Sequence, residues 1–382
     1  MRFQVNRDVL SEAVSFAVKL LPQRTTLPIL SGVLIEAEGD ELVLSSFDYE
    51  VSARTHISAS IDEPGRVLVS GRLLAEIANR LPSAPVTVTT EDNKIVVACG
   101  ASRFILPSMP VEEYPSLPEV AEKGAAVDAE RFSAAIAQVV VAASRDDVTP
   151  VITGVQLEVS AESISLVATD RYRVAVRDVA WDGPSSSSEE PVSALVPART
   201  LAEIGKTFGH AGTVSIAITH TADRELIAFH ADRKTVTSLL IKGNFPPVRR
   251  LFPETVENYA VVNTADLIEA VRRVSLVLER EAALRFSFSS DGLVLDAAGS
   301  EQAQASETLD AFLTGIATVV SLKPQFLLDG LASVHSDFVR LSFTKTENPN
   351  KPGPVLITSQ ASKDQPGTDN YRYLLQPNLL LR

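Results

Sequence analysis

The sequence predicts an α+β fold built from three repeated units, each with two helices packed on antiparallel sheets. Two sets of helix-like segments recur at a constant spacing, and the alternating apolar and polar residues between them are typical of strands. The length of 382 residues exceeds one typical domain and is sufficient for two or three.

The first helix of each unit is expected to begin after an Asn or Asp, because these side chains accept hydrogen bonds from the first free backbone N–H groups. The three segments are VNRDVLSEAVSFAV from Val5, VDAERFSAAIAQVV from Val127 and VNTADLIEAVRRVS from Val262. Leu10, Ala13, Val14 and Ala17 follow the spacing of a buried helix face. These patterns predict helices over residues 6–20, 128–144 and 263–281.

The second helix of each unit follows a strand end and a turn with small residues or proline. Its three segments are VSGRLLAEIANRLP from Val69, LVPARTLAEIGKTFG from Leu195 and SLKPQFLLDGLASVH from Ser321. The aligned Leu74, Leu201 and Leu327 lie 127 and 126 residues apart, which supports a true repeat. The predicted helices cover residues 70–81, 197–209 and 323–334.

The intervals between the helices predict strands and hairpins. The same place in the three units is occupied by ELVLSSFDYEVSARTHI, SISLVATDRYRVAVRDV and GLVLDAAGSEQAQASETL. Domains are predicted at residues 1–121, 126–253 and 258–382, separated by the segments AEKGAA and PETVEN.

The net charge of −13, from 35 basic and 48 acidic residues, argues against a protein that holds DNA on a broad basic face. This charge is still compatible with a protein that stays on DNA by enclosing it.

Cys99 is the only cysteine, so no disulfide framework is possible, and a buried strand position is expected for it. The N-terminus lacks a signal-peptide core, and the apolar run Phe132–Ala143 is too short to span a membrane. A cytoplasmic location without membrane contact is therefore predicted.

The sequence offers no convincing catalytic or metal-binding set, so neither an enzyme nor a cofactor is expected. His210, His220 and His230 have a ten-residue spacing that fits neither a helix face nor a short metal loop. No P-loop, G-x-G-x-x-G or G-x-S-x-G motif occurs. Asp146 and Asp147 are adjacent acids shortly before a proline, a pattern typical of a solvated turn.

Four separated segments carry a family resemblance. They are RTTLPILSGVLIEA (Arg24–Ala37), VATDRYRVAV (Val167–Val176), NFPPVRRLFP (Asn244–Pro253) and YLLQP (Tyr373–Pro377). In this order, and over the whole chain, they resemble the β-subunit family of bacterial DNA polymerase III, the sliding clamps. The resemblance implies three clamp domains in a head-to-tail homodimeric ring whose helices line a central hole.

The function that the resemblance implies is tethering without catalysis. A sliding clamp is a processivity factor that encircles duplex DNA regardless of its sequence and holds the polymerase to its template. The implied partners are the DNA polymerase III α subunit, the clamp loader and other proteins that carry a clamp-binding motif.

The six predicted helices carry no net charge between them, so the rest of the chain carries the whole of the −13. A bore less negative than the outer surface suits a sliding ring, because strong phosphate contacts would slow it and a negative lining would repel DNA. The resemblance implies that Arg24 reaches toward DNA, with an exposed loop arginine as the alternative. The other expected bore residues, for which ordinary solvated helix faces are the alternative, are Arg80, Arg199, Lys206, Arg272 and Arg273.

For ring closure, the resemblance places Phe104 of one chain against Leu276 and Val277 of the other. The alternative is that all three residues lie in the interior of their own domains, because apolar residues at helical spacing usually do.

The resemblance also implies a groove between the second and third domains that binds short partner peptides with apolar and aromatic anchors. The matching positions are Ile152, Thr169, Arg171, Tyr172, Arg173, Val174, Pro246, Leu251, Leu374, Leu375, Gln376, Pro377 and Asn378. An apolar floor with a few polar groups suits such a site.

Two departures from the family pattern bear on this groove. Gln376 and Asn378 stand where a Met-Pro-Met or Met-Pro-Val tail is expected, so an amide replaces a flexible thioether. Arg171 and Tyr172 replace a common Gly-His pair, which makes that wall bulkier and more cationic. The alternative functions are a specialised second clamp copy with altered partner or inhibitor binding, and a repeat scaffold that forms no ring.

Overall fold

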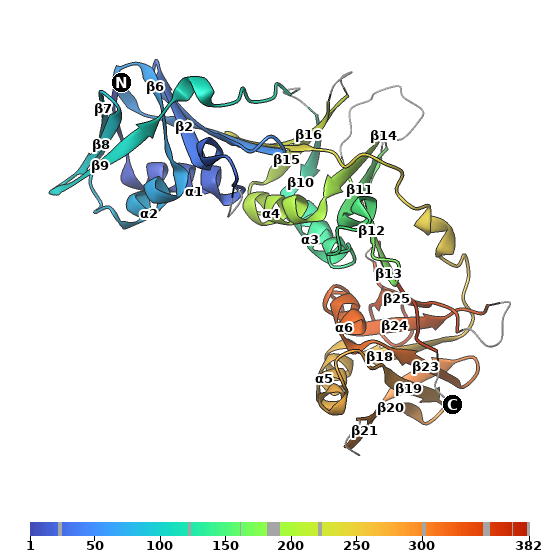
Figure 1. Ribbon diagram of the computed structural model, residues 1–382. Coiled ribbons are helices and arrows are strands. Elements are labelled where there is room, and N and C mark those ends of the chain that lie inside the picture. Colours follow the sequence, from blue (N-terminus) through green and yellow to red (C-terminus); the bar gives the residue numbers. More distant parts are fainter. Residues whose placement is uncertain are drawn as a thin grey trace. The chain divides into compact units, whose positions relative to one another are not determined.

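The computed structural model describes residues 1–21, 25–120, 124–160, 162–181, 192–220, 224–299, 303–346, 352–368 and 370–379. The chain forms two compact units, each with sheets of its own (Figure 1). The first unit comprises Met1–Ser133, Trp181–Pro184 and Glu203–Leu240. The second comprises Ala134–Ala180, Ser185–Ala202 and Ile241–Arg382. The second repeat thus contributes to both units, and the domain boundaries given above remain a prediction.

The first unit is built on a 13-stranded sheet. In order across the sheet, its strands are β10 (Ala125–Asp128), β15 (Thr213–His220), β16 (Glu225–Ala231), β17 (Lys234–Leu239), β4 (Val51–Ser58), β3 (Glu41–Phe47), β2 (Gly32–Glu38), β6 (Gly65–Ser70), β9 (Ser102–Met109), β8 (Lys94–Cys99), β7 (Val86–Glu91), β1 (Arg2–Val5) and β5 (Ser60–Glu63). The antiparallel pairing of β17 with β4, from Lys234 opposite Thr55 to Ser238 opposite Val51, joins the second repeat to the first.

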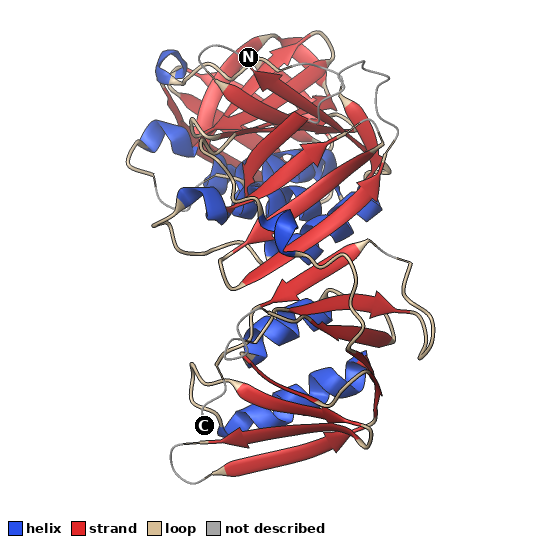
Figure 2. Cartoon of the chain, turned by 90° about the vertical axis from the view of Figure 1, so that its right-hand side faces the viewer, coloured by secondary structure: helices blue, strands red, loops and turns tan. Residues whose placement is uncertain are grey.

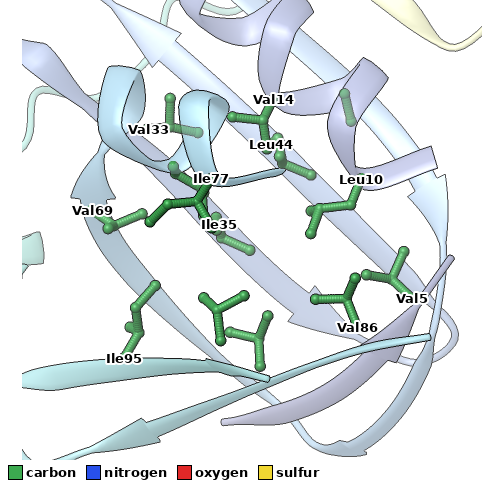
Figure 3. Packing of buried hydrophobic residues seen from close by; sticks show 14 of the residues in the cluster. Val5, Leu10, Val14, Val33, Ile35, Leu44, Val69, Ile77, Val86 and Ile95 are labelled. Carbon is green, nitrogen blue, oxygen red and sulfur yellow. The ribbon is translucent and has the colours of Figure 1, made fainter. Parts of the chain in front are cut away.

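The core of the first repeat lies between this sheet and helices α1 (Arg7–Lys19) and α2 (Gly71–Arg80), which pack against each other. Figure 3 shows Leu10 and Val14 of α1 and Ile77 of α2 pointing toward strand residues such as Ile35 and Val69. The predicted helix face is confirmed, because its four members are at most 2% exposed. Cys99 is also buried, as expected.

The second unit contains a nine-stranded and a four-stranded sheet. The larger has the order β14 (Val192–Pro197), β11 (Gly154–Val159), β12 (Ser163–Thr169), β13 (Arg173–Ala180), β26 (Tyr371–Leu375), β25 (Val355–Gln360), β24 (Phe338–Phe343), β18 (Tyr259–Asn263) and β22 (Ala311–Thr314). The smaller has the order β21 (Gln304–Leu309), β20 (Gly292–Ala298), β19 (Leu284–Ser289) and β23 (Thr318–Leu322). Antiparallel pairing of β13 with β26 joins the second repeat to the third.

The remaining helices are α3 (Ala129–Val140), α4 (Ala198–Phe208), α5 (Thr264–Val274) and α6 (Pro324–Ala332). Strands form most of the regular structure, and α5 and α6 pack side by side and against strands of the second unit (Figure 2). The predicted caps are confirmed: Asn6, Asp128 and Asn263 accept hydrogen bonds from backbone N–H groups of their first helical turns. The α+β class with antiparallel sheets is likewise confirmed.

Two helices end earlier than the sequence pattern predicts. The α5 helix stops at Val274 and continues as the short 3-10 helix η5 (Ser275–Val277). At this point the Ser275 hydroxyl donates to the Val271 carbonyl, which occupies an acceptor at the end of the helix. The α3 helix stops at Val140, where backbone bonds of the i→i+3 type from Ala142 and Ala143 replace the helical ladder. Apolar periodicity continued past both ends, so it could not reveal either stop.

No helix in the described ranges is long and apolar enough to cross a membrane.

Candidate functional site

A cavity of about 490 Å³ opens in the second unit where three elements meet. They are the segment that follows α3 and includes the 3-10 helix η3 (Pro150–Thr153), the turn between β12 and β13, and α6. Segments from the second and third repeats therefore line one shared space.

The turn between β12 and β13 forms one wall of this cavity. The Asp170 carboxylate accepts hydrogen bonds from the backbone N–H groups of Tyr172 (3.0 Å) and Arg173 (3.1 Å). Aspartate suits this place because its side chain takes the part of a backbone acceptor. Arg171 has a left-handed φ of 79°, and its N–H donates to Thr169 Oγ1 at 3.2 Å. Side-chain hydrogen bonds thus fix the turn.

Arg173 reaches from this turn to α6 and is only 8% exposed. Its Nε donates to Asp170 Oδ2 at 2.9 Å, and its Nη1 donates to Asp329 Oδ2 at 2.6 Å. The same Nη1 lies 3.1 Å from the hydroxyl of Tyr373, and the guanidinium carbon is 4.4 Å from the centre of the Phe326 ring. A buried cation with two carboxylates and an aromatic face therefore ties the second repeat to the third.

The charge at this junction is stable to pH. Burial of the guanidinium opposes its charge, but Tyr373 and the two carboxylates outweigh this and hold the pKa of Arg173 above its ordinary value. Burial raises the pKa of the Tyr373 hydroxyl, although Arg173 pulls it down. Both side chains therefore stay protonated at neutral pH.

An apolar cluster lies on the opposite face of the same strands. Adjacent strand residues point to opposite faces, so Val174 and Leu374 lie across the sheet from Arg173 and Tyr373. The buried members of the cluster are Val167, Val174, Val176, Val248 and Leu374, and Phe245, Phe252 and Leu356 pack against them. The segment with the 3-10 helix η4 (Val248–Leu251) covers this face.

Three hydrogen bonds hold the segment around Gln376 and Asn378, near the end of the chain. The Gln376 N–H donates to the Tyr172 carbonyl at 2.9 Å, and the Gln376 side-chain amide donates to the Pro352 carbonyl at 3.2 Å. The Asn378 N–H donates to the Ser321 carbonyl at 2.8 Å. The amide of Gln376 thus has a structural partner that a thioether would lack.

The structure divides the predicted groove residues between the cavity and its surroundings. Ile152, Arg171, Tyr172 and Arg173 line the cavity, and Tyr172 is 58% exposed. Beside it, Gln376 is exposed and Asn378 half-buried, while Leu251 is exposed and Pro246 half-buried over the apolar cluster. The buried remainder is Thr169, Val174, Leu374, Leu375 and Pro377. All thirteen lie in the second unit, and their role in binding remains a prediction.

Nine residues that line the cavity were not among the predicted groove residues. They are Ala143, Ser144, Arg145, Asp146, Thr149, Asp170, Gln325, Phe326 and Asp329. One signal was available for Phe326, a half-buried aromatic residue immediately before Leu327, the leucine that marks the core face of α6. An aromatic residue beside that face points to a contact outside the core of its own helix. No comparable sequence signal identifies Asp329, because its partner Arg173 is 156 residues away.

The predicted DNA-contacting residues that the structure describes are exposed helix residues. Arg80 and Arg199 have exposed side chains. Lys206 pairs with Glu203 at 2.9 Å and Arg272 with Glu269 at 2.7 Å. Arg273 is also exposed, and it pairs with Glu307 at 2.6 Å. Arg24 lies outside the described residues.

The residues predicted for ring closure lie at the surface of their units. Phe104 on β9 is 39% exposed, Leu276 in η5 is 84% exposed, and Val277 is half-buried. None of the three lies in a core of the chain, so the interior alternative is wrong. An apolar side chain as exposed as Leu276 is a candidate for a contact with another molecule.

Within the described ranges, no group of three or more His, Cys, Asp or Glu side chains is placed to hold a metal ion.

Comparison with protein families gives three consecutive matches. Residues 1–118 match the N-terminal domain of the DNA polymerase III beta subunit, residues 126–247 its central domain, and residues 249–363 its C-terminal domain.

Curated relatives resemble the chain over nearly its whole length. It is 43% identical over 378 residues to the beta sliding clamp of Streptomyces coelicolor, with 99% of each chain covered. It is 39% identical over 379 residues to the beta sliding clamp homolog GriR of Streptomyces muensis, again with 99% of each covered.

Solved structures agree with this similarity. The DNA polymerase sliding clamp of Bacillus subtilis superimposes with a TM-score of 0.90 at 26% identity, covering 100% of both chains. A sliding clamp from Pseudomonas aeruginosa bound to griselimycin superimposes with a TM-score of 0.89 at 25% identity, also covering 100% of both.

Proposed function

Because the chain belongs to the DNA polymerase III β-subunit family, the β sliding clamps, we propose that it encircles duplex DNA as a head-to-tail homodimeric ring. The ring tethers the replicative polymerase in the cytoplasm and performs no chemistry of its own. The observation that carries this proposal is the match of all three clamp domains, in order, along one chain.

The charges of the described helices support sliding. Lys206 and Arg272 are partly neutralised by acidic residues one helical turn away, at Glu203 and Glu269. Exposed pairs of this kind carry no net charge, so they neither repel DNA strongly nor bind its phosphates tightly. A ring that holds DNA topologically needs no more than this.

The cavity beside Tyr172 and Phe326 supports a partner-binding role. The two aromatic rings lie 6.0 Å apart between centres, beside a mouth lined by polar groups. An exposed aromatic side chain held by a rigid junction suits the docking of a short peptide with apolar anchors. The partners we propose are the polymerase α subunit, the clamp loader and other proteins with a clamp-binding motif.

Retention on DNA after loading tests the ring directly. The protein, loaded by a clamp loader, is expected to remain on circular duplex DNA and to leave linear duplex of the same length within minutes through its free ends. Gel filtration of labelled protein with each DNA measures the difference. Equal loss from both forms would contradict a topological ring.

A second candidate function is that of a specialised clamp copy whose groove has altered affinity for partners or for a clamp-directed inhibitor. The hydrogen bond from the Gln376 amide to the Pro352 carbonyl favours it, because it holds in place a position that a flexible methionine would leave adaptable. Griselimycin, which is bound to a sliding clamp from Pseudomonas aeruginosa, is a suitable ligand probe.

Gln376→Met is expected to raise peptide affinity several-fold, because a thioether adapts to apolar anchors and no longer has to break a bond to Pro352. Fluorescence anisotropy with a labelled peptide that carries Leu and Phe anchors measures the change, and griselimycin is titrated in parallel. Arg272→Gln, a helix-surface change away from the groove, is the control. Equal affinities of parent and Gln376→Met for both ligands would remove the support for a specialised copy.

A further inference from the structure

The backbone of Arg171 is strained for an arginine. Its φ of 79° lies in the left-handed region, which costs most residues other than glycine on the order of 1 kcal/mol. Asp170 and Thr169 hold the turn in this shape through hydrogen bonds to its N–H groups.

Tyr49 has the same left-handed backbone, with a φ of 73°, in the matching turn of the first repeat, where Asp48 accepts from the N–H groups of Glu50 and Val51. The shape of the turn is therefore a feature of the repeat, and the side chain at this position is what differs between the two copies.

The Arg171 side chain extends across the cavity. Its Nη2 donates to Thr149 Oγ1, which belongs to the segment after α3 on the far side of the mouth. A guanidinium has five N–H donors, and this one has no carboxylate partner among the described residues. Its remaining donors are exposed at the opening of the cavity.

The other charged groups near the cavity are already engaged. Asp170 accepts from Arg173 and from two backbone N–H groups, and Asp329 accepts from Arg173 and Gln325. Lys323, which lies over the rings of Tyr172 and Phe326, pairs with Glu281 at 2.9 Å.

Three charged residues of the cavity lining are exposed at the surface. Arg145 and Asp146 are neighbours of opposite sign, and one oxygen of Asp146 accepts the Val148 N–H. Arg171 is the third, and no ion pair joins it to an acid of the described lining, in which three arginines and three aspartates balance in formal charge. The remaining N–H donors of Arg171 are therefore available to an acceptor on a ligand, and a carboxylate is the acceptor that a guanidinium binds most strongly.

We propose that Arg171 binds a carboxylate side chain of the docked peptide, so that an Asp or Glu is a specificity element of the partners of this groove. The inference rests on the proposed peptide-binding function and adds the chemical class of the bound segment. Arginine suits this task because its planar fork can keep one N–H on Thr149 and offer others to a carboxylate.

Paired peptides test this preference. A fluorescein-labelled peptide with Leu and Phe anchors is prepared with a single Asp at each successive position, beside matched peptides with Asn at the same position. At one position the Asp peptide is expected to bind the parent about fivefold more tightly than its Asn twin, as for one partly exposed ion pair. The advantage should shrink as salt is raised, because the pair is near solvent.

Two substitutions assign the preference to Arg171. Arg171→Asn removes the charge while tolerating the left-handed backbone, so the Asp-to-Asn affinity ratio is expected to fall to about one. Its melting temperature is expected to be unchanged or higher, which separates lost recognition from lost folding. Arg171→Lys keeps the charge and is expected to retain part of the ratio.

The outcomes separate this inference from the proposed function beneath it. Binding of all peptides without any Asp preference overturns the role of Arg171 and leaves the groove standing. An Asp preference that survives in Arg171→Asn also overturns it. If no peptide binds the parent protein, the proposed peptide-binding function is wrong, and the inference about Arg171 is wrong with it.

Discussion

Replacing Arg173 with methionine is expected to lower the free energy of unfolding of the second unit by about 3 kcal/mol, the cost of removing one partner from a buried ion pair. The change leaves Asp170 and Asp329 close together without their shared cation and removes the guanidinium from the Phe326 ring. Urea denaturation followed by far-ultraviolet circular dichroism measures the change, as a shift in the unfolding transition of the second unit.

A matched surface substitution controls for the loss of any arginine. Arg272 also pairs with an acid, but its side chain is 62% exposed, so Arg272→Met is expected to cost less than about 0.5 kcal/mol. Arg173→Lys should be intermediate, because one ammonium cannot reproduce the fork that serves two carboxylates. Equal midpoints for Arg173→Met and Arg272→Met would show that the buried junction contributes nothing to stability.

Arg173→Met is also expected to weaken peptide binding more than tenfold, because the ion pairs of Arg173 fix the turn that carries Arg171 and Tyr172. A double-mutant cycle with Asp329→Asn measures the coupling between turn and helix. Additive effects would contradict a positioning role for the pair.

Leu276→Glu is expected to dissociate the proposed ring into single chains without unfolding them. Leu276 is 84% exposed in one chain, so the fold does not depend on it. Burying a leucine contributes about 1.5–3 kcal/mol, and a carboxylate in its place must also be desolvated, so each interface should weaken by at least about 3 kcal/mol. Light scattering is expected to change from twice the chain mass of 41.0 kDa to one chain mass.

Ile316→Glu is the matched control for this prediction. Ile316 is another exposed apolar residue of the third repeat, at 67%, and lies outside the predicted interface. It should leave the mass and the retention on circular DNA unchanged, while Leu276→Glu should abolish retention. A doubled mass for Leu276→Glu would mean that another surface joins the chains. A single-chain mass for the parent would favour the scaffold that forms no ring.

Most of the fold could be predicted because its signals are local. An Asn or Asp cap followed by a regular apolar stripe identifies the start of α1, α3 and α5 within a few residues of chain, and the repetition of both helices fixed the period. The ends of α3 and α5 were missed, since a tight final turn leaves no mark on apolar periodicity.

The candidate site was predicted only where one segment carries several of its residues. Arg171, Tyr172 and Arg173 lie together in one polar turn, which made them visible. Phe326 and Asp329 approach them only because α6 packs beside β26, and no spacing along the chain encodes that contact. The sequence also could not show which of Arg171 and Arg173 is buried and which is exposed, because the two residues are chemically identical and only two positions apart.

The sequence by itself determined the three repeats, their α+β class and the segments that the family shares, because caps, periodicity and motifs depend on near neighbours. Only the tertiary structure decided what each polar residue of the turn does. It buries Arg173 between Asp170 and Asp329, and it leaves Arg171 on a left-handed backbone with free donors at the surface. Burial and hydrogen-bond partners set the role of a charged side chain, and here they are supplied by residues up to 200 positions away.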